Sequence, residues 1–276
     1  MTINCKGNLI DLSNPKIMGI LNLTPDSFFD GGKNFNIDIA IKNVSKMLEE
    51  GADFIDIGAY SSRPNAVNIS VNEEIDRLIP VLIELNKTFP KAHFSIDTFR
   101  SEVAEIALEN GACMINDISG GSLDQKMFEI IAKFQVPYVM MHLVGTPQNM
   151  TQNTAYQNLI TEILFYFSEK INIARTYNIN DIIIDPGFGF SKTIDQNFEL
   201  LQNMKLLEMC NLPILAGISR KSMIYKTLET TPEFALNGTT ALNMTALQNG
   251  ANILRVHEVK EAKECITLFN KLQIYA

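Results

Sequence analysis

The chain has 276 residues, of which 46% are hydrophobic and 20% are charged, so it can bury a sizeable core and lacks the composition of a disordered protein. Its formal net charge of −8 provides no overall positive field for a DNA or RNA backbone, which argues against nucleic acid as a partner. Any anionic substrate must therefore be held by a few local cations and backbone N–H groups.

Short apolar runs rich in β-branched residues alternate with longer amphipathic stretches along the chain. We expect residues 1–15 to form an N-terminal segment, with a small hairpin that closes the bottom of a single domain spanning 1–276. Eight strands are then predicted near 16–21, 53–57, 93–97, 113–116, 137–142, 181–185, 213–217 and 252–256. Because helical patterns separate these strands, the sequence predicts an α/β fold of the (β/α)8 TIM-barrel type.

The stretches 37–50, 155–177 and 196–210 carry apolar residues at steps of three and four, which predicts helices with one buried stripe. Glycine-alanine pairs at 51–52, 111–112 and 250–251 each precede a predicted strand by one or two residues. A glycine there can take the left-handed backbone conformation that ends a helix. These pairs therefore support the same repeated unit.

Polar residues follow the predicted strands, at the end of a parallel barrel where active sites lie. One such side chain is explained equally well as a cap for the next helix. A complete series favours a shared polar site. The residues are Asn22, Asp56, Asp97, Asn116, His142, Asp185, the group Ser219-Arg220-Lys221, and Arg255 with His257.

These polar residues divide by their chemistry. Carboxylates, an amide and one cation suit a flat heterocycle rich in N–H donors, and these are Asp97, Asn116, Asp185 and Lys221. Cationic donors suit a phosphate or diphosphate, and these are Arg63, Arg255 and His257.

Two long loops, 22–32 and 58–64, are rich in glycine, proline and polar residues. Loops of this kind often close over a substrate, although a flexible surface loop explains the same composition. The segment 185–190, Asp-Pro-Gly-Phe-Gly-Phe, is compatible with a phosphate-binding turn or with close backbone packing.

The four cysteines, Cys5, Cys113, Cys210 and Cys265, are scattered and form no C-x-x-C pair. We expect them to be buried reduced thiols. The first twelve residues lack the apolar core of a signal peptide, and no run approaches the ~18 apolar residues of a membrane helix. The expected location is the reducing cytoplasm.

Eight segments together resemble the successive motifs of dihydropteroate synthases. They are MGILNLTPDSFFDGG (18–32), DIGAYSSRP (56–64), SIDT (95–98), NDISG (116–120), MH (141–142), DPGFGF (185–190), GISRKS (217–222) and RVHEV (255–259). The resemblance implies a transferase of folate biosynthesis that joins 6-hydroxymethyl-7,8-dihydropterin diphosphate to p-aminobenzoate and releases pyrophosphate. It further implies a Mg²⁺ cofactor, inhibition by sulfonamides and a homodimer formed through barrel helices.

The resemblance also implies roles for individual residues. The pterin positions are Asp97, Asn116, Asp185, Lys221 and Met141. The diphosphate positions are Asn22, Arg63, Arg255 and His257, with Asn22 as the metal ligand. The p-aminobenzoate positions are Phe28, Ser62, Arg63, Pro64, Phe190, Ser219, Lys221 and Ser222. The residues expected to act in catalysis are Lys221, Asp97, Asp185, Arg255, His257 and the loop residues Asp30 and Arg63.

In the mechanism that the resemblance implies, diphosphate leaves first, and the aniline nitrogen attacks the cationic pterin methylene. No covalent protein nucleophile is required, so we predict that Cys113 is not catalytic. The chain departs from the family pattern at Tyr60, Ser62 and Asn65 in the second loop, and at Glu258 near the end. We expect Ser62 to keep a hydroxyl contact and to lose the methyl contact of the usual threonine.

Two other functions fit parts of the pattern. A methyltetrahydrofolate-dependent methyltransferase shares the barrel and some of the Asp and Asn positions, but it has little reason to keep a diphosphate site. Arg63, the group Ser219-Arg220-Lys221 and the pair Arg255 and His257 together argue against it. A pterin-binding module without catalysis is raised by the altered second loop, because ligand binding does not guarantee turnover.

Overall fold

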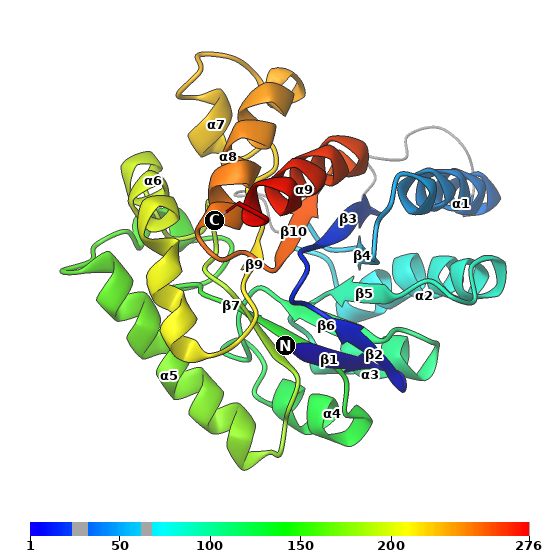
Figure 1. The fold of residues 1–276 in the computed structure, drawn as a ribbon. Helices are drawn as coiled ribbons and strands as arrows, with labels where there is room; N and C mark the ends of the chain where they lie inside the picture. The colour runs from blue at the N-terminus through cyan, green and yellow to red at the C-terminus, as the bar shows by residue number, and fades with distance from the viewer. Residues whose placement is uncertain (24–32, 62–67, 276) are drawn as a thin grey trace.

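The computed structural model describes residues 1–23, 33–61 and 68–275. An N-terminal hairpin is followed by alternating strands and helices (Figure 1). The strands are β1 (Thr2–Cys5), β2 (Asn8–Asp11), β3 (Lys16–Asn22), β4 (Phe54–Gly58), β5 (Phe94–Asp97), β6 (Met114–Asp117), β7 (Tyr138–Met141), β8 (Ile182–Asp185), β9 (Leu215–Ala216) and β10 (Ile253–Val256). The α-helices are α1 (Lys33–Glu49), α2 (Val71–Thr88), α3 (Ser101–Glu109), α4 (Lys126–Phe134), α5 (Leu159–Thr176), α6 (Ile194–Asn203), α7 (Ser222–Tyr225), α8 (Leu236–Gln248) and α9 (Val259–Gln273). Short 3₁₀ segments are η2 (Met150–Gln152), η3 (Met204–Cys210) and η4 (Pro232–Phe234).

Eight parallel strands pair in the order β8-β7-β6-β5-β4-β3-β10-β9. The two ends of this sheet meet through a parallel bridge between Ile184 and Ile214, and Ile184 N donates to Pro213 O at 2.9 Å. The sheet is thus a nearly closed barrel with helices around it (Figure 1). The predicted (β/α)8 fold is confirmed, and each predicted strand overlaps an observed one.

The helix boundaries follow local capping chemistry. The predicted helix 155–177 begins at Leu159, because the side chain of Asn158 accepts a bond from Thr161 N at 3.0 Å. The predicted helix 196–210 begins earlier, at Ile194, where Thr193 and Gln196 form a capping box. Its α-helical part ends at Asn203 and continues as η3. Gly51 follows α1 with a φ of +101°, which is the predicted left-handed end of a helix.

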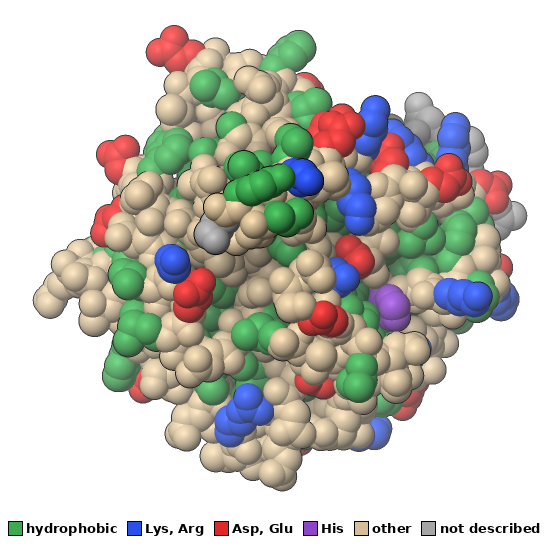
Figure 2. All heavy atoms as spheres, in the orientation of Figure 1, with side chains coloured by type: hydrophobic (Ala, Val, Ile, Leu, Met, Phe, Trp, Pro, Cys, Tyr) green, Lys and Arg blue, Asp and Glu red, His purple; other side chains and the backbone are tan. Residues whose placement is uncertain are grey.

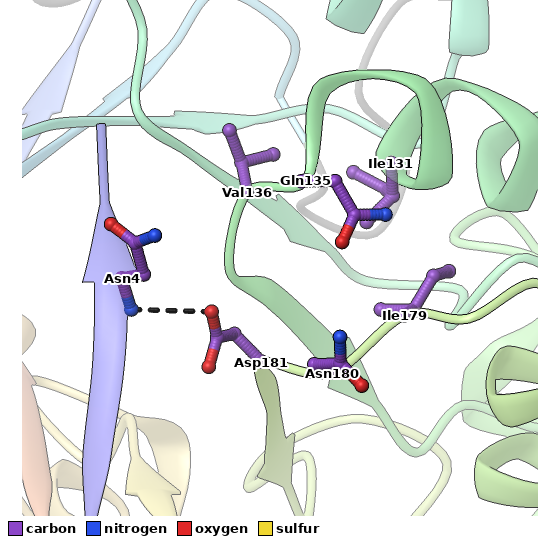
Figure 3. A pocket seen from close by; sticks show the side chains of 7 residues that line it. All are labelled: Asn4, Ile131, Gln135, Val136, Ile179, Asn180 and Asp181. Atoms are coloured by element: carbon purple, nitrogen blue, oxygen red, sulfur yellow. Dashed lines mark hydrogen bonds between the residues drawn. The ribbon is translucent and has the colours of Figure 1, made fainter. Parts of the chain in front are cut away.

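The bottom of the barrel is filled by apolar side chains that the hairpin covers. We call this set the base cluster; it comprises Ile3, Cys5, Leu12, Met18, Phe54, Cys113, Met114, Val139, Ile183, Leu215 and Ile253. Asn4 N donates to Asp181 Oδ2 at 3.2 Å, beside a cavity of about 120 Å³ (Figure 3). The hairpin predicted to close the bottom is therefore confirmed.

The four cysteines are free thiols, and Cys5 and Cys113 belong to the base cluster. Acidic and basic side chains are interspersed on the face in Figure 2, and among the residues coloured there no extended basic track is seen. Within the described ranges, no helix is both long and apolar enough to cross a membrane.

Candidate active site

Arg255 is the centre of a polar group at the C-terminal ends of four strands. Its Nε lies 2.6 Å from Asp56 Oδ2, and its Nη2 lies 2.7 Å from Asp97 Oδ2. Asn116 Nδ2 donates to the same Asp56 oxygen at 2.9 Å. Asp97 and Asn116 are register partners on neighbouring parallel strands, so their side chains share one face of the sheet. The topology therefore brings these four residues together.

Asp185 and Lys221 lie close to Arg255, because the charges of Arg255 and Asp185 both act on Lys221. A Cβ added at Gly217 would lie 4.0 Å from Asp185 Oδ2 and 3.9 Å from Arg255 Cβ, so Gly217 lies beside both side chains. Asp185 Oδ1 accepts from Gly187 N at 2.8 Å. The Lys221 ammonium lies 4.2 Å from the centre of the Phe190 ring.

Burial controls the protonation of this group. It raises the pKa of Asp97 to about 7, against the attraction of Arg255, and it also raises the pKa of Asp185. Burial lowers the pKa of Lys221 to about 8, and the charge of Arg255 adds to that shift. Asp56 Oδ1 is buried and has no hydrogen-bond partner among the described residues. The group is thus rich in carboxylate acceptors beside two cations.

A second group of polar side chains lies at the rim. Ser219 Oγ is 2.8 Å from His257 Nδ1, and Arg220 pairs with Glu258 through its Nε at 2.6 Å. Glu258, which departs from the family pattern, therefore forms an ion pair with Arg220 at this rim. Ser222 begins α7 directly after Lys221.

Asn22 ends β3 next to Gly58. A Cβ on Gly58 would lie 3.7 Å from Asn22 Oδ1 and 3.7 Å from Asp97 Oδ2, so the amide and the carboxylate flank the same glycine. Within the described ranges, no group of three or more His, Cys, Asp or Glu residues is arranged to hold a metal ion. Asn22 could thus serve as one oxygen ligand, with the others supplied by substrate and water.

An apolar cluster lies beside the polar group. We call it the mouth cluster; it comprises Ile118, Met141, Leu143, Met150 and Phe190, with Phe99 packed against it. Met141 and Phe190 were predicted at the pterin and p-aminobenzoate positions. A flat aromatic ligand would find an apolar surface here.

His142 does not join the polar group. Its ring packs edge-on against Tyr166 of α5, with 4.9 Å between ring centroids, and its Nδ1 lies 3.0 Å from Lys192 Nζ. Successive residues of a strand point to opposite faces, so Met141 faces the mouth cluster while His142 faces α5. The expectation that all the polar strand ends share one site is therefore wrong for His142.

Three features were not predicted from the sequence. The sequence analysis assigns Asp56 to a strand end but to no ligand. Its place at a strand end is the sequence feature that indicates a site residue. Lys192 is buried against the segment 185–190, and no sequence signal distinguished it. Tyr60, which departs from the family pattern, connects two loops. Its hydroxyl accepts a hydrogen bond from Gln148 Nε2 at 3.0 Å, and its ring packs edge-on against Phe99. The predicted residues Phe28, Asp30, Ser62, Arg63 and Pro64 lie outside the described residues.

Comparisons with known proteins identify the family of the chain. The family model described as pterin binding enzyme matches residues 18–257. A dihydropteroate synthase of Clostridium beijerinckii is 44% identical over 89% of this chain and 89% of its own length. A Yersinia pestis dihydropteroate synthase solved with a sulfonamide drug complex superposes with a TM-score of 0.93, at 38% identity over 99% of this chain and 100% of that one. A Xanthomonas albilineans dihydropteroate synthase solved with 4-aminobenzoic acid gives a TM-score of 0.91, at 36% identity over 99% of this chain and 98% of that one. With matches that extend over nearly its whole length, the chain belongs to the pterin-binding enzyme family, among the dihydropteroate synthases.

Proposed function

We propose that this protein joins 6-hydroxymethyl-7,8-dihydropterin diphosphate to p-aminobenzoate and releases pyrophosphate, as a step of folate biosynthesis. The observation that carries the proposal is that Asp97, Asn116, Asp185 and Lys221 lie together around Arg255 at the C-terminal ends of the strands. Carboxylates accept from the N–H groups of a pterin ring, and the amide and ammonium donate to its ring acceptors.

Arg255 can serve the pterin side and the diphosphate side at once. A guanidinium carries five N–H donors. Two of its nitrogens, Nε and Nη2, bond Asp56 and Asp97, which leaves further N–H groups for a departing diphosphate. His257, at the exposed rim, would add a second donor. Preorganised donors of this kind stabilise charge as it grows on a leaving group.

The carboxylates would stabilise the other half of the separated charge. When diphosphate leaves, positive charge spreads over the pterin, and the carboxylates of Asp97 and Asp185 would stabilise it. Asp185 is buried and Asp97 is half-buried, and this limited contact with water strengthens their electrostatic effect. The aniline nitrogen of p-aminobenzoate would approach from the side of Phe190, Ser219 and Ser222. Sulfonamides would compete for this same pocket.

Mg²⁺ fits the site as an ion carried mainly by the diphosphate. Mg²⁺ prefers oxygen ligands and keeps several waters, so one amide oxygen from Asn22 suffices on the protein side. When bound, the ion would supply positive charge to the leaving group.

We also propose a cytoplasmic homodimer. The cytoplasm is supported by the four free cysteines, which a reducing compartment preserves. A dimer through barrel helices is supported by apolar side chains exposed on η3 and α9, namely Leu206, Met209, Leu268 and Leu272. Sedimentation equilibrium would test the dimer, and a monomer at micromolar concentration would exclude it.

The decisive assay combines the purified protein with the dihydropterin diphosphate, p-aminobenzoate and Mg²⁺, and measures pyrophosphate and the pteroate product by mass. We expect equal amounts of both products, and loss of both in EDTA. Lys221→Ala should reduce kcat/KM by at least about 100-fold, because it removes a preorganised cation. Lys16→Met is the matched control and should remain active, because Lys16 lies at the N-terminal end of β3, at the bottom of the barrel. Pterin binding without product would instead support the non-catalytic module.

A further inference from the structure

Lys192 is a buried lysine that the proposed reaction does not use. Its side chain follows the segment 185–190, and the residue is only 8% exposed. Its Nζ lies 3.1 Å from Gly187 O, 3.0 Å from Phe190 O and 3.0 Å from His142 Nδ1. No ion pair within the described residues includes Lys192. Burial lowers the pKa of Lys192 to about 7, against the attraction of the Asp185 carboxylate. The three acceptors bond the amine whether or not it is charged, because both forms can donate through N–H.

His142 is suited to accept from this lysine. Burial and the neighbouring charge of Lys192 lower the pKa of His142 to about 2, so the imidazole is neutral at any ordinary pH. A neutral ring that accepts at Nδ1 carries its proton on Nε2. Lys192 therefore links the end of β7 to both carbonyls of the turn that follows β8.

The same turn is held tightly at other points. Gly187 has a φ of +73°, and a Cβ there would lie 2.3 Å from His142 O, so the two backbones are in direct contact. Ser191 Oγ donates to Val144 O at 2.9 Å and accepts from Val144 N at 3.0 Å. Lys192 supplies the only ammonium bonded to the carbonyls of Gly187 and Phe190 among the described residues.

The other side of this turn contacts the proposed pterin site. The Phe190 ring lies 4.2 Å from the Lys221 ammonium. A Cβ on Gly189 would lie 3.0 Å from Lys221 Cδ, so the backbone of the turn also limits where the Lys221 side chain can lie. Asp185, at the start of the turn, accepts from Gly187 N. The path of residues 185–190 thus sets the relative positions of Asp185, Phe190 and Lys221.

We propose that Lys192 is a positioning residue: by holding the carbonyls of Gly187 and Phe190 against His142, it fixes the Phe190 ring under Lys221 and keeps Lys221 directed at the pterin site. The catalytic part of this proposal rests on the proposed function, whereas the placement of Lys221 does not. Lys192 itself touches no reacting atom in this assignment.

The test is Lys192→Met in the full chain, with Lys16→Met as the matched control. Protein labelled with ¹³C at the lysine ε-carbons is observed by NMR, and the Lys221 signal is identified by its loss in Lys221→Ala. The Phe190 ring current should displace that signal in the unmodified protein. We expect Lys192→Met to move it towards the value of an exposed lysine, and Lys16→Met to leave it in place.

Turnover gives the second measurement. Lys192→Met should lower kcat/KM by roughly 100-fold, since a displacement of about 1 Å in a catalytic group can have that effect. An unchanged Lys221 signal or an unchanged kcat/KM in folded Lys192→Met would overturn the proposal. If that variant does not fold, His142→Ala removes one of the three acceptors and should shift the same signal in the same direction; no shift would overturn it. Because the NMR signal needs no turnover, an inactive unmodified protein would contradict only the proposed function.

Discussion

At the N-terminal end of the barrel, Ile3 and Leu12 of the hairpin region belong to the apolar base cluster. At the other end of the same strands, the buried Asp56 and the half-buried Asp97 both pair with Arg255. Burial of apolar surface stabilises the folded state. Burial of charges costs free energy that their pairing only partly offsets. We call the N-terminal end of the barrel the closed end and the C-terminal end the open end. The closed end should therefore stabilise the fold without affecting ligand binding, while the charged groups at the open end serve binding and catalysis.

The strongest test of this comparison is Arg255→Ala. It leaves the buried Asp56 and the half-buried Asp97 without their shared cation, and loss of one partner from a buried ion pair typically costs about 3–5 kcal/mol. We expect a fall of that size in the free energy of unfolding measured with urea, together with loss of turnover. Arg220→Ala at the more exposed rim is the control and should cost no more than about 1 kcal/mol. Equal stability losses in the two variants would contradict the comparison.

Leu12→Ala tests the closed end. Leu12 is fully buried in the base cluster, and truncation of a buried leucine to alanine costs roughly 2–5 kcal/mol. The free energy of unfolding should fall by that amount, while the pterin Kd at 25 °C stays within about twofold, because no ligand group of the open end is displaced. A large change in pterin Kd in a protein that is still folded would show that the two ends are coupled.

Pterin affinity should depend on pH through Asp97. Burial raises the pKa of this carboxyl to about 7, so it loses its charge as the pH falls through that value. A protonated carboxyl is a poorer acceptor for pterin N–H groups, so the Kd should rise by up to about tenfold for each pH unit below 7. Calorimetric titrations between pH 5 and 8 would measure it. In Asp97→Asn the affinity should be weak at every pH, and a slope equal to that of the unmodified protein would assign the titration to another group.

The sequence was sufficient to predict those features that depend on strand pattern. Apolar runs that end in Asp97, Asn116 and Asp185 predict both the strands and the grouping of their polar ends, because parallel strands share one edge. His142 was misplaced because a shift of one residue changes the face to which a side chain points. The links made by Lys192 and Tyr60 could not be predicted, since they depend on the path of loops between distant strands.

The smallest expected effect concerns Cys113, which lies in the base cluster beside Cys5. Replacement by serine puts a hydroxyl into an apolar environment, which should cost about 1 kcal/mol in the free energy of unfolding. Catalysis should be unaffected, because the group lies at the end of the barrel away from Lys221 and Asp185, and the proposed reaction needs no thiol. The measurement is kcat/KM for p-aminobenzoate in Cys113→Ser, with Cys265→Ser, at another buried thiol, as the matched control. An inactive but folded Cys113→Ser would show that the closed end takes part in the chemistry. The assignment of stability to one end and catalysis to the other would then be wrong.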